Sequence, residues 1–248
     1  MTSDRFIRLD PAADGGLARL DIHLPPVNVF GAADLDELSR AVENARSCRV
    51  LLLSGLPRAF SAGVSIEEHV PEAGPIERML AAMRGALAAL VETPAVTVAS
   101  ISGACLGGGA EIASACDIVL AAEDARIGFP EIRLGCFPPA AAVLLPPRIG
   151  ETRAAEWILT GQTYSGTEAA AAGFATRAVP AASLESETRK LVEGLLSRGA
   201  AALAAARDVL RRPRREALAT RLAYAEDAYR KLEGDPDLAR TVREFKRR

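Results

Sequence analysis

CLGGGAEIASACDIVLAAEDARIGFPEIRLG, residues 105–135, is the stretch that decides the fold of this chain. Its triple glycine, 107–109, lies where the apolar run 95–101 gives way to a helical pattern. The first backbone amides of a helix have no partner within the helix and point outward. The sequence therefore predicts hydrogen-bond donors here that could stabilise a developing negative charge.

Two carboxylates flank this glycine turn. Glu111 follows it directly, and Glu131 comes twenty residues later, after Pro130. An acid and a base beside backbone donors indicate an enzyme that moves protons. Each feature also has a simpler interpretation. Glu111 could only favour the helix dipole, Glu131 could be a surface residue at a strand end, and the glycines could only permit close packing.

Regular elements alternate on both sides of this stretch. Short apolar runs at 17–24, 49–55, 95–103 and 117–124 predict strands, and helical patterns separate them. The segment 75–93 begins with proline and repeats apolar residues every three or four positions, which predicts a helix. This alternation is typical of an α/β fold.

The last quarter of the chain changes composition. It is rich in Ala, Leu, Arg and Glu, which predicts helices. Pro213 and the pair Gly234 and Pro236 are expected to break it into about three segments. We therefore expect a core with the active site at 1–182 and a helical oligomerisation region at 183–248, packed on the core or on a neighbouring subunit.

Composition excludes several classes of function. With 30 basic and 32 acidic residues the net charge is −2, so nothing favours nucleic acid or an anionic membrane surface as a partner. The N-terminus lacks a signal-peptide pattern and no run is long enough to span a bilayer, so we expect a cytoplasmic protein. Two histidines and no CxxC spacing predict no metal site. The cysteines are expected to be buried free thiols: Cys48, Cys105, Cys116 and Cys136.

Three motifs together resemble the crotonase (enoyl-CoA hydratase and isomerase) superfamily. They are RAFSAGVSIEEH at 58–69, the block from 94 to 135, and PPRIG at 146–150. The resemblance implies a ClpP/crotonase-like spiral of ββα units with a C-terminal helical trimerisation region. It also implies a homotrimer, or a hexamer made of two trimers. The substrate would be an acyl-CoA thioester, and no separate cofactor is expected because CoA is part of the substrate.

The resemblance assigns roles to four positions. Val64 and Gly108 would supply the backbone N–H groups of an oxyanion hole, and Glu111 and Glu131 would be the catalytic glutamates. Many isomerases of the superfamily lack one of these glutamates. Keeping both favours water addition, in which one carboxylate takes a proton from water and the other orients the water or delivers a proton to carbon.

Further positions would bind substrate or CoA by the same resemblance. They are Arg58, Ala62, Ser65, Ile66, Gly107, Pro130 and Pro138. Arg58 could equally be a solvated loop cation, and Ser65 could cap the following turn. Lys246 or Arg248 could reach the CoA of a neighbouring subunit. Tyr229 is expected to be a packing residue.

At two places the sequence differs from straight-chain hydratases, and these differences narrow the range of expected substrates. Ser65 stands where an aspartate is usual, and CFPPAAAVLLPPRIG at 136–150 replaces a Gly-rich turn. Both departures resemble the cyclohexa-1,5-diene-1-carbonyl-CoA hydratases, which implies water addition to a conjugated cyclic diene to give 6-hydroxycyclohex-1-ene-1-carbonyl-CoA.

Several alternatives stay open. They are a general enoyl-CoA hydratase, a double-bond isomerase, and a non-catalytic member that serves as an oligomeric subunit. A dinucleotide-binding module is disfavoured, because the glycines do not form GxGxxG after a first strand.

Overall fold

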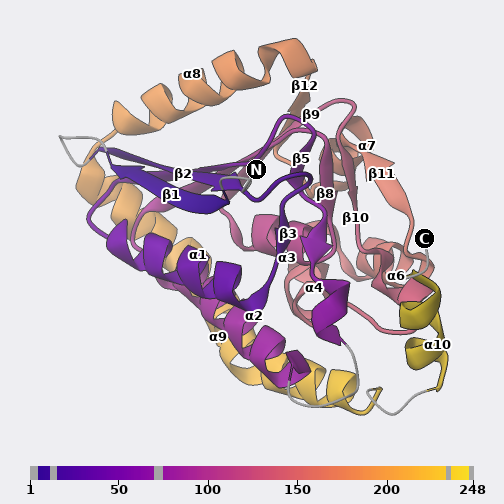
Figure 1. Cartoon of the computed structure of the whole chain (residues 1–248). Helices are drawn as coiled ribbons and strands as arrows, with labels where there is room; N and C mark the ends of the chain where they lie inside the picture. The colour runs from indigo at the N-terminus through magenta and orange to yellow at the C-terminus, as the bar shows by residue number, and fades with distance from the viewer. Residues whose placement is uncertain (1–4, 12–15, 70–74, 233–235, 246–248) are drawn as a thin grey trace.

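The computed structural model describes residues 5–11, 16–69, 75–232 and 236–245 (Figure 1). The strands are β1 (Phe6–Pro11), β2 (Leu17–His23), β3 (Val29–Phe30), β4 (Val50–Ser54), β5 (Ala59–Ser61), β6 (Gly63–Val64), β7 (Val96–Ile101), β8 (Ala104–Leu106), β9 (Ile118–Ala122), β10 (Arg126–Gly128), β11 (Thr163–Ser165) and β12 (Arg177–Val179).

The α-helices are α1 (Ala32–Asn44), α2 (Pro75–Glu92), α3 (Gly108–Ala115), α4 (Pro139–Leu144), α5 (Pro146–Ile149), α6 (Glu151–Thr160), α7 (Gly166–Ala172), α8 (Leu184–Leu196), α9 (Ala200–Arg230) and α10 (Pro236–Phe245). Short 3-10 helices are η1 (Ile66–His69), η2 (Pro130–Leu134) and η3 (Ala181–Ser183).

The larger sheet has six strands in the order β1-β2-β4-β7-β9-β12. The pairs from β2 to β12 are parallel, and only β1 is antiparallel to its neighbour. In Figure 1, α8 lies over one side of this sheet, and α1, α2 and α9 lie on the other. Parallel strands covered on both faces are apolar along their whole length. This burial explains the apolar runs that correctly predicted β4, β7 and β9. The run that predicted β2 differs, because β2 alternates buried with more exposed residues and includes Arg19 and Asp21.

A second sheet joins short strands in the order β11-β10-β8-β5. Three times the chain passes from a long strand of the first sheet to a short strand of the second and then to a helix. The units are β4–β5 before α2, β7–β8 before α3, and β9–β10 before α4. The expected spiral of ββα units is therefore confirmed. Each turn of the spiral delivers the residues after a short strand to one region of the molecule.

The C-terminal region is helical, as expected, but one predicted break is wrong. Pro213 lies inside the 31-residue helix α9 and does not end it. Tertiary contacts hold both halves of this helix. Buried Arg207 and Arg211 anchor the first half, and buried Leu222 and Tyr229 anchor the second. These contacts offset the hydrogen bond that a proline removes. The domain boundary between residues 182 and 183 stays a prediction.

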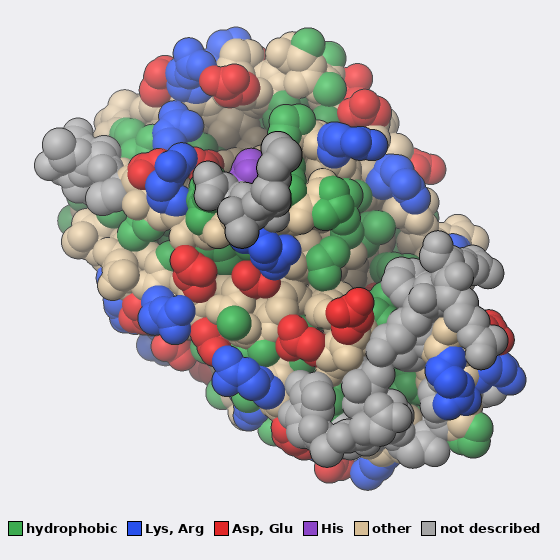
Figure 2. Space-filling model, in the orientation of Figure 1, with side chains coloured by type: hydrophobic (Ala, Val, Ile, Leu, Met, Phe, Trp, Pro, Cys, Tyr) green, Lys and Arg blue, Asp and Glu red, His purple; other side chains and the backbone are tan. Residues whose placement is uncertain are grey.

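The surface agrees with the near-neutral charge of the chain. Figure 2 shows acidic and basic side chains scattered over one face of the molecule. Across the described ranges, no helix is both long and apolar enough to cross a membrane, and no group of His, Cys, Asp and Glu could hold a metal ion. All four cysteines are buried free thiols, as predicted. Lys246 and Arg248 lie outside the described residues.

Candidate active site

The glycine turn connects β8 to α3, as the sequence predicts. Gly107 is the residue before α3 and has φ 50° and ψ −126°, a conformation that favours glycine. A Cβ at this position would lie 2.6 Å from Glu131 Oε1. Glycine is therefore required here both by its backbone and by the close approach of the Glu131 carboxylate.

A second backbone segment reaches the same place. The Ser61 hydroxyl accepts a hydrogen bond from Gly63 N (3.0 Å) and donates one to Asn28 O (2.6 Å), which fixes the segment before Val64. A Cβ on Gly108 would lie 2.7 Å from Val64 Cγ1 and 3.6 Å from Val64 N. The structure thus brings Val64 and Gly108, the two expected oxyanion residues, side by side.

Glu111 lies in the first turn of α3 and is 4% exposed. Its Oε1 accepts hydrogen bonds from Ala140 N and Ala141 N, each 2.9 Å long, at the start of α4. Pro138 and Pro139 have no N–H, so these two amides are the first donors that α4 offers. Burial raises the pKa of Glu111 to about 7, although the two amide hydrogen bonds act in the opposite direction.

Glu131 lies on η2, directly after Pro130. Within the described residues its Oε2 atom is buried and has no hydrogen-bond partner. Burial, and next the negative charge of Glu111, raise the pKa of Glu131 to about 8. Two like charges this close resist ionising together, so the pair retains a proton near neutral pH.

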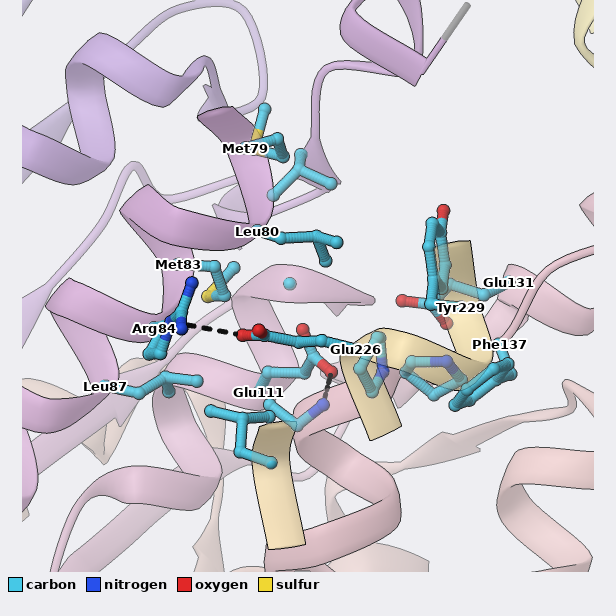
Figure 3. Close-up of a pocket in the computed structure, with 16 residues that line it drawn as sticks. Met79, Leu80, Met83, Arg84, Leu87, Glu111, Glu131, Phe137, Glu226 and Tyr229 are labelled. Atoms are coloured by element: carbon cyan, nitrogen blue, oxygen red, sulfur yellow. Dashed lines mark hydrogen bonds and ion pairs between the residues drawn. The ribbon is translucent and has the colours of Figure 1, made fainter. Parts of the chain in front are cut away.

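These groups line a cavity with two adjoining chambers. Val64, Gly108, Glu131 and Tyr229 contribute to both chambers. The first is shown in Figure 3. Its other lining residues come from α2, α3, the start of α4, and α9: Met79, Leu80, Met83, Arg84, Leu87, Glu111, Phe137, Pro138, Pro139, Ala140, Leu222 and Glu226. A mostly apolar cavity with a few convergent polar groups is typical of a small-molecule site.

The second chamber is next to the first and shares four lining residues with it. It is lined further by Ala62, Gly63, Ile66, Gly107, Pro130, Leu134, Cys136 and Leu238. Helices far apart in the sequence therefore meet here, since Leu238 belongs to α10 and Ile66 to η1. The cavity is continuous with the backbone donors of the glycine turn.

Most of the expected substrate-binding residues reach this cavity. Ala62, Ile66, Gly107 and Pro130 line the second chamber, and Pro138 lines the first.

Two expected binding residues lie elsewhere. Ser65 lines a neighbouring groove with Val27, Val29 and Glu67, and its N–H donates to Phe30 O. Arg58 is exposed on the loop before β5 and lines neither chamber. Its expected contact with the CoA part of the substrate stays a prediction.

Sequence reasoning missed the contribution of α9. Glu226 and Tyr229 line the cavity from this helix, opposite Arg84 of α2. One pattern in the sequence could have indicated that α9 lines the cavity. Leu222, Ala225, Glu226 and Tyr229 repeat at helical spacing, and all four are buried. A glutamate on the apolar face of a helix is unusual and marks a possible site.

Comparison with known proteins agrees with this geometry. The family model described as Enoyl-CoA hydratase/isomerase matches residues 12–248. A cyclohexa-1,5-dienecarbonyl-CoA hydratase of Thauera aromatica is 37% identical over 158 residues, which are 62% of this chain and 60% of that protein. A probable enoyl-CoA hydratase of Bacillus subtilis is 40% identical over 164 residues, 64% of each chain. The matched segments thus cover less than two thirds of these two relatives.

Solved structures match the whole fold. An enoyl-CoA hydratase from Mycobacterium avium subsp. paratuberculosis superposes with a TM-score of 0.87 and 26% identity, over 97% of this chain and 95% of that one. An enoyl-CoA hydratase from Bacillus halodurans reaches a TM-score of 0.89 at 20% identity, over 96% of this chain and 99% of that one, which shows the shared fold alone. The family match covers nearly the entire chain, so this protein belongs to the enoyl-CoA hydratase/isomerase family.

Proposed function

We propose that the protein adds water to a conjugated CoA thioester. One observation carries this proposal. Two carboxylates, that of the buried Glu111 and that of Glu131, whose Oε2 atom is buried, share a cavity with the adjacent backbones of Val64 and Gly108. The amides of Val64 and Gly108 would hold the thioester oxygen while negative charge collects on it as an enolate. Losing one such donor typically costs about 2.7 to 4 kcal/mol of barrier.

The two environments suggest a division of labour between the glutamates. Glu111 accepts two amide hydrogen bonds, which favour its ionised form, and so it suits the base that takes a proton from water. Glu131 has an oxygen without a hydrogen-bond partner in the described residues, which disfavours its ionised form, and so it suits the acid that protonates carbon. Water oxygen bonds to the β-carbon, and the enolate collapses as carbon takes the proton. Proton transfer between the carboxylates then restores the starting state.

The substrate we favour is cyclohexa-1,5-diene-1-carbonyl-CoA, hydrated to 6-hydroxycyclohex-1-ene-1-carbonyl-CoA. The similarity to the Thauera aromatica hydratase supports this substrate. Phe137, Pro138 and Pro139 also support it, because they give the first chamber a stiff apolar wall that suits a ring. CoA enters as part of the substrate, so we propose that no separate cofactor takes part.

We also propose that the working form is a homotrimer or a hexamer of two trimers. On α9, Val209 and Leu210 are 72% and 76% exposed, which leaves apolar surface for another subunit. Sedimentation velocity would test this. A protein that sediments as a monomer at micromolar concentration would contradict it.

The function is tested by offering cyclohexa-1,5-diene-1-carbonyl-CoA and crotonyl-CoA separately to the purified protein. Loss of the conjugated-thioester absorbance and a product heavier by one water are expected, with higher kcat/KM for the cyclic diene. Preference for crotonyl-CoA would indicate a general enoyl-CoA hydratase. A product of unchanged mass would indicate an isomerase. Turnover of neither substrate would contradict the proposed function.

A further inference from the structure

The first chamber contains a polar group that water addition does not use. Glu226, on α9, has a side chain that is 3% exposed, yet it lines a chamber whose other α2 and α9 residues are mainly apolar. Figure 3 shows Glu226 reaching from α9 toward Arg84 of α2. A buried charge among apolar side chains is costly, so its retention needs a reason.

The ion pairs of Glu226 are long. Arg84 Nε lies 3.4 Å from Glu226 Oε1, and Arg230 Nη2 lies 3.5 Å from Glu226 Oε2. Arg230 makes a closer contact with a different partner, because its Nε lies 2.6 Å from Glu77 Oε1. Burial raises the pKa of Glu226, and the two arginines only partly oppose that effect. The carboxylate is therefore held loosely enough to accept another hydrogen bond.

The local charge is balanced. Glu226 and Glu77 contribute two negative charges, and Arg84 and Arg230 contribute two positive charges. A charged substituent beside the buried Glu226 carboxylate would upset this balance. A neutral hydroxyl would not, and it can donate to the Glu226 carboxylate while it accepts from the Arg84 guanidinium.

We propose that Glu226 and Arg84 recognise a hydroxyl group on the acyl part of the substrate. The accepted substrates would then include, beside the unsubstituted cyclic diene, ring-hydroxylated acyl-CoA thioesters whose additional hydroxyl lies away from the bond that reacts beside Glu111 and Glu131. This inference rests on the proposed function for the identity of the ligand as an acyl-CoA. Glu226 and Arg84 are specificity residues in this account and take no part in proton transfer.

Binding of saturated ligands tests the inference without turnover. Calorimetry would compare cyclohexanecarbonyl-CoA with its 3-hydroxy and 4-hydroxy derivatives. For the wild-type protein, at least one hydroxylated ligand is expected to bind about tenfold more tightly than the parent. Glu226→Leu should abolish that preference or reverse it, since the hydroxyl would lose its acceptor. Glu226→Gln should restore part of it, because the amide oxygen still accepts.

A matched control separates recognition from helix docking. Asp36→Asn breaks the 2.8 Å ion pair of Asp36 with Arg78 between α1 and α2, and neither residue lines the chamber, so it should leave the ratio of the affinities unchanged. If neither hydroxylated ligand binds more tightly than the parent, or if Glu226→Leu keeps the wild-type ratio, the inference is wrong. Hydration of crotonyl-CoA by the same wild-type preparation tests the proposed function separately.

Discussion

The two ends of α3 hold carboxylates in opposite electrostatic surroundings. At its start, Glu111 shares the cavity with Glu131, and both pKa values are raised. Just past its end, Asp117 accepts from Arg207 Nε (2.9 Å) and also from Arg211.

The direction of the Asp117 pKa shift shows the difference. Burial alone would raise this pKa, but Arg211 and Arg207 outweigh burial and lower it to about 2. At the start of α3, which we propose to be catalytic, no cation balances the two glutamates in the described residues. Past the end of α3, Arg207 and Arg211 balance the charge of Asp117 and hold α9 to the core.

The largest expected effect is on catalysis at the first end. Glu131→Gln keeps the size of the side chain but cannot give up a proton, so kcat for hydration should fall by about 10²- to 10⁴-fold. Steady-state rates on a conjugated CoA thioester measure this. The folded state should survive, because Glu131 holds the proton of the pair near neutral pH and the Gln amide replaces a neutral carboxyl group of similar size. A variant with wild-type kcat would exclude Glu131 from the chemistry.

The opposite end should respond in the opposite way. Asp117→Asn leaves the guanidinium groups of Arg207 and Arg211, which are 6% and 1% exposed, without their counter-charge. Breaking a buried ion pair typically costs about 3 to 5 kcal/mol, so the free energy of unfolding should drop by that order. Urea denaturation measures the loss, and kcat of the folded fraction should stay within a few-fold of wild type. An unchanged free energy of unfolding would show that the ion pairs of Asp117 with Arg207 and Arg211 do not stabilise the fold.

Geometry at the glycine turn gives a smaller effect. In Gly107→Ala the new methyl group would meet the Glu131 carboxylate at 2.6 Å, where φ is also positive. We expect kcat/KM to fall by about tenfold or more, since small displacements of catalytic groups are costly. Gly150→Ala is the matched control, because Gly150 also has positive φ (85°) but a methyl group there would have no atom of another segment within 4 Å. Equal losses in both variants would show that backbone strain alone is responsible.

The mildest test is the pH dependence of stability. The pKa values of Glu111 and Glu131 in the folded state lie above their ordinary value of 4.5, so the folded protein binds protons more tightly. Stability from this pair should therefore be present below about pH 4.5 and decline as the pH rises toward 8. Asp117 has a lowered pKa, so its contribution is lost as the pH falls from 3.8 toward 2.

Glu131→Gln isolates the contribution of the pair. Unfolding free energies measured in urea across pH 5 to 8 should fall less steeply in this variant than in wild type. The same slope in both proteins would mean that Glu131 ionises normally in the folded state.

The sequence predicted the features of these two ends that depend on local patterns. It did not predict those that depend on contacts between residues far apart in the chain. The apolar runs and the triple glycine are local signals, and they correctly placed β7, β9 and the start of α3. The pairing of Asp117 with Arg207 and Arg211 joins residues about ninety positions apart, and no local pattern announces it. The same contacts stabilise α9 on the N-terminal side of Pro213, so the helix continues past the proline that was predicted to end it.

The site was predictable to a similar degree. The motif placed Glu111, Glu131, Val64 and Gly108 together, and the structure brings all four to one cavity. Glu226 was missed because its position follows from α9 returning across the cavity, which is a tertiary event. Only its place on the apolar face of a helix could have indicated it.

The most direct test of the account is a double-mutant cycle on the hydration rate. Wild type, Glu111→Gln, Glu131→Gln and the double variant would be compared on the same conjugated CoA thioester. Groups that act as a unit are not additive, so the double variant should be no slower than the slower single variant. Losses that multiply in the double variant, or a single variant with wild-type rate, would contradict a paired acid and base at the start of α3.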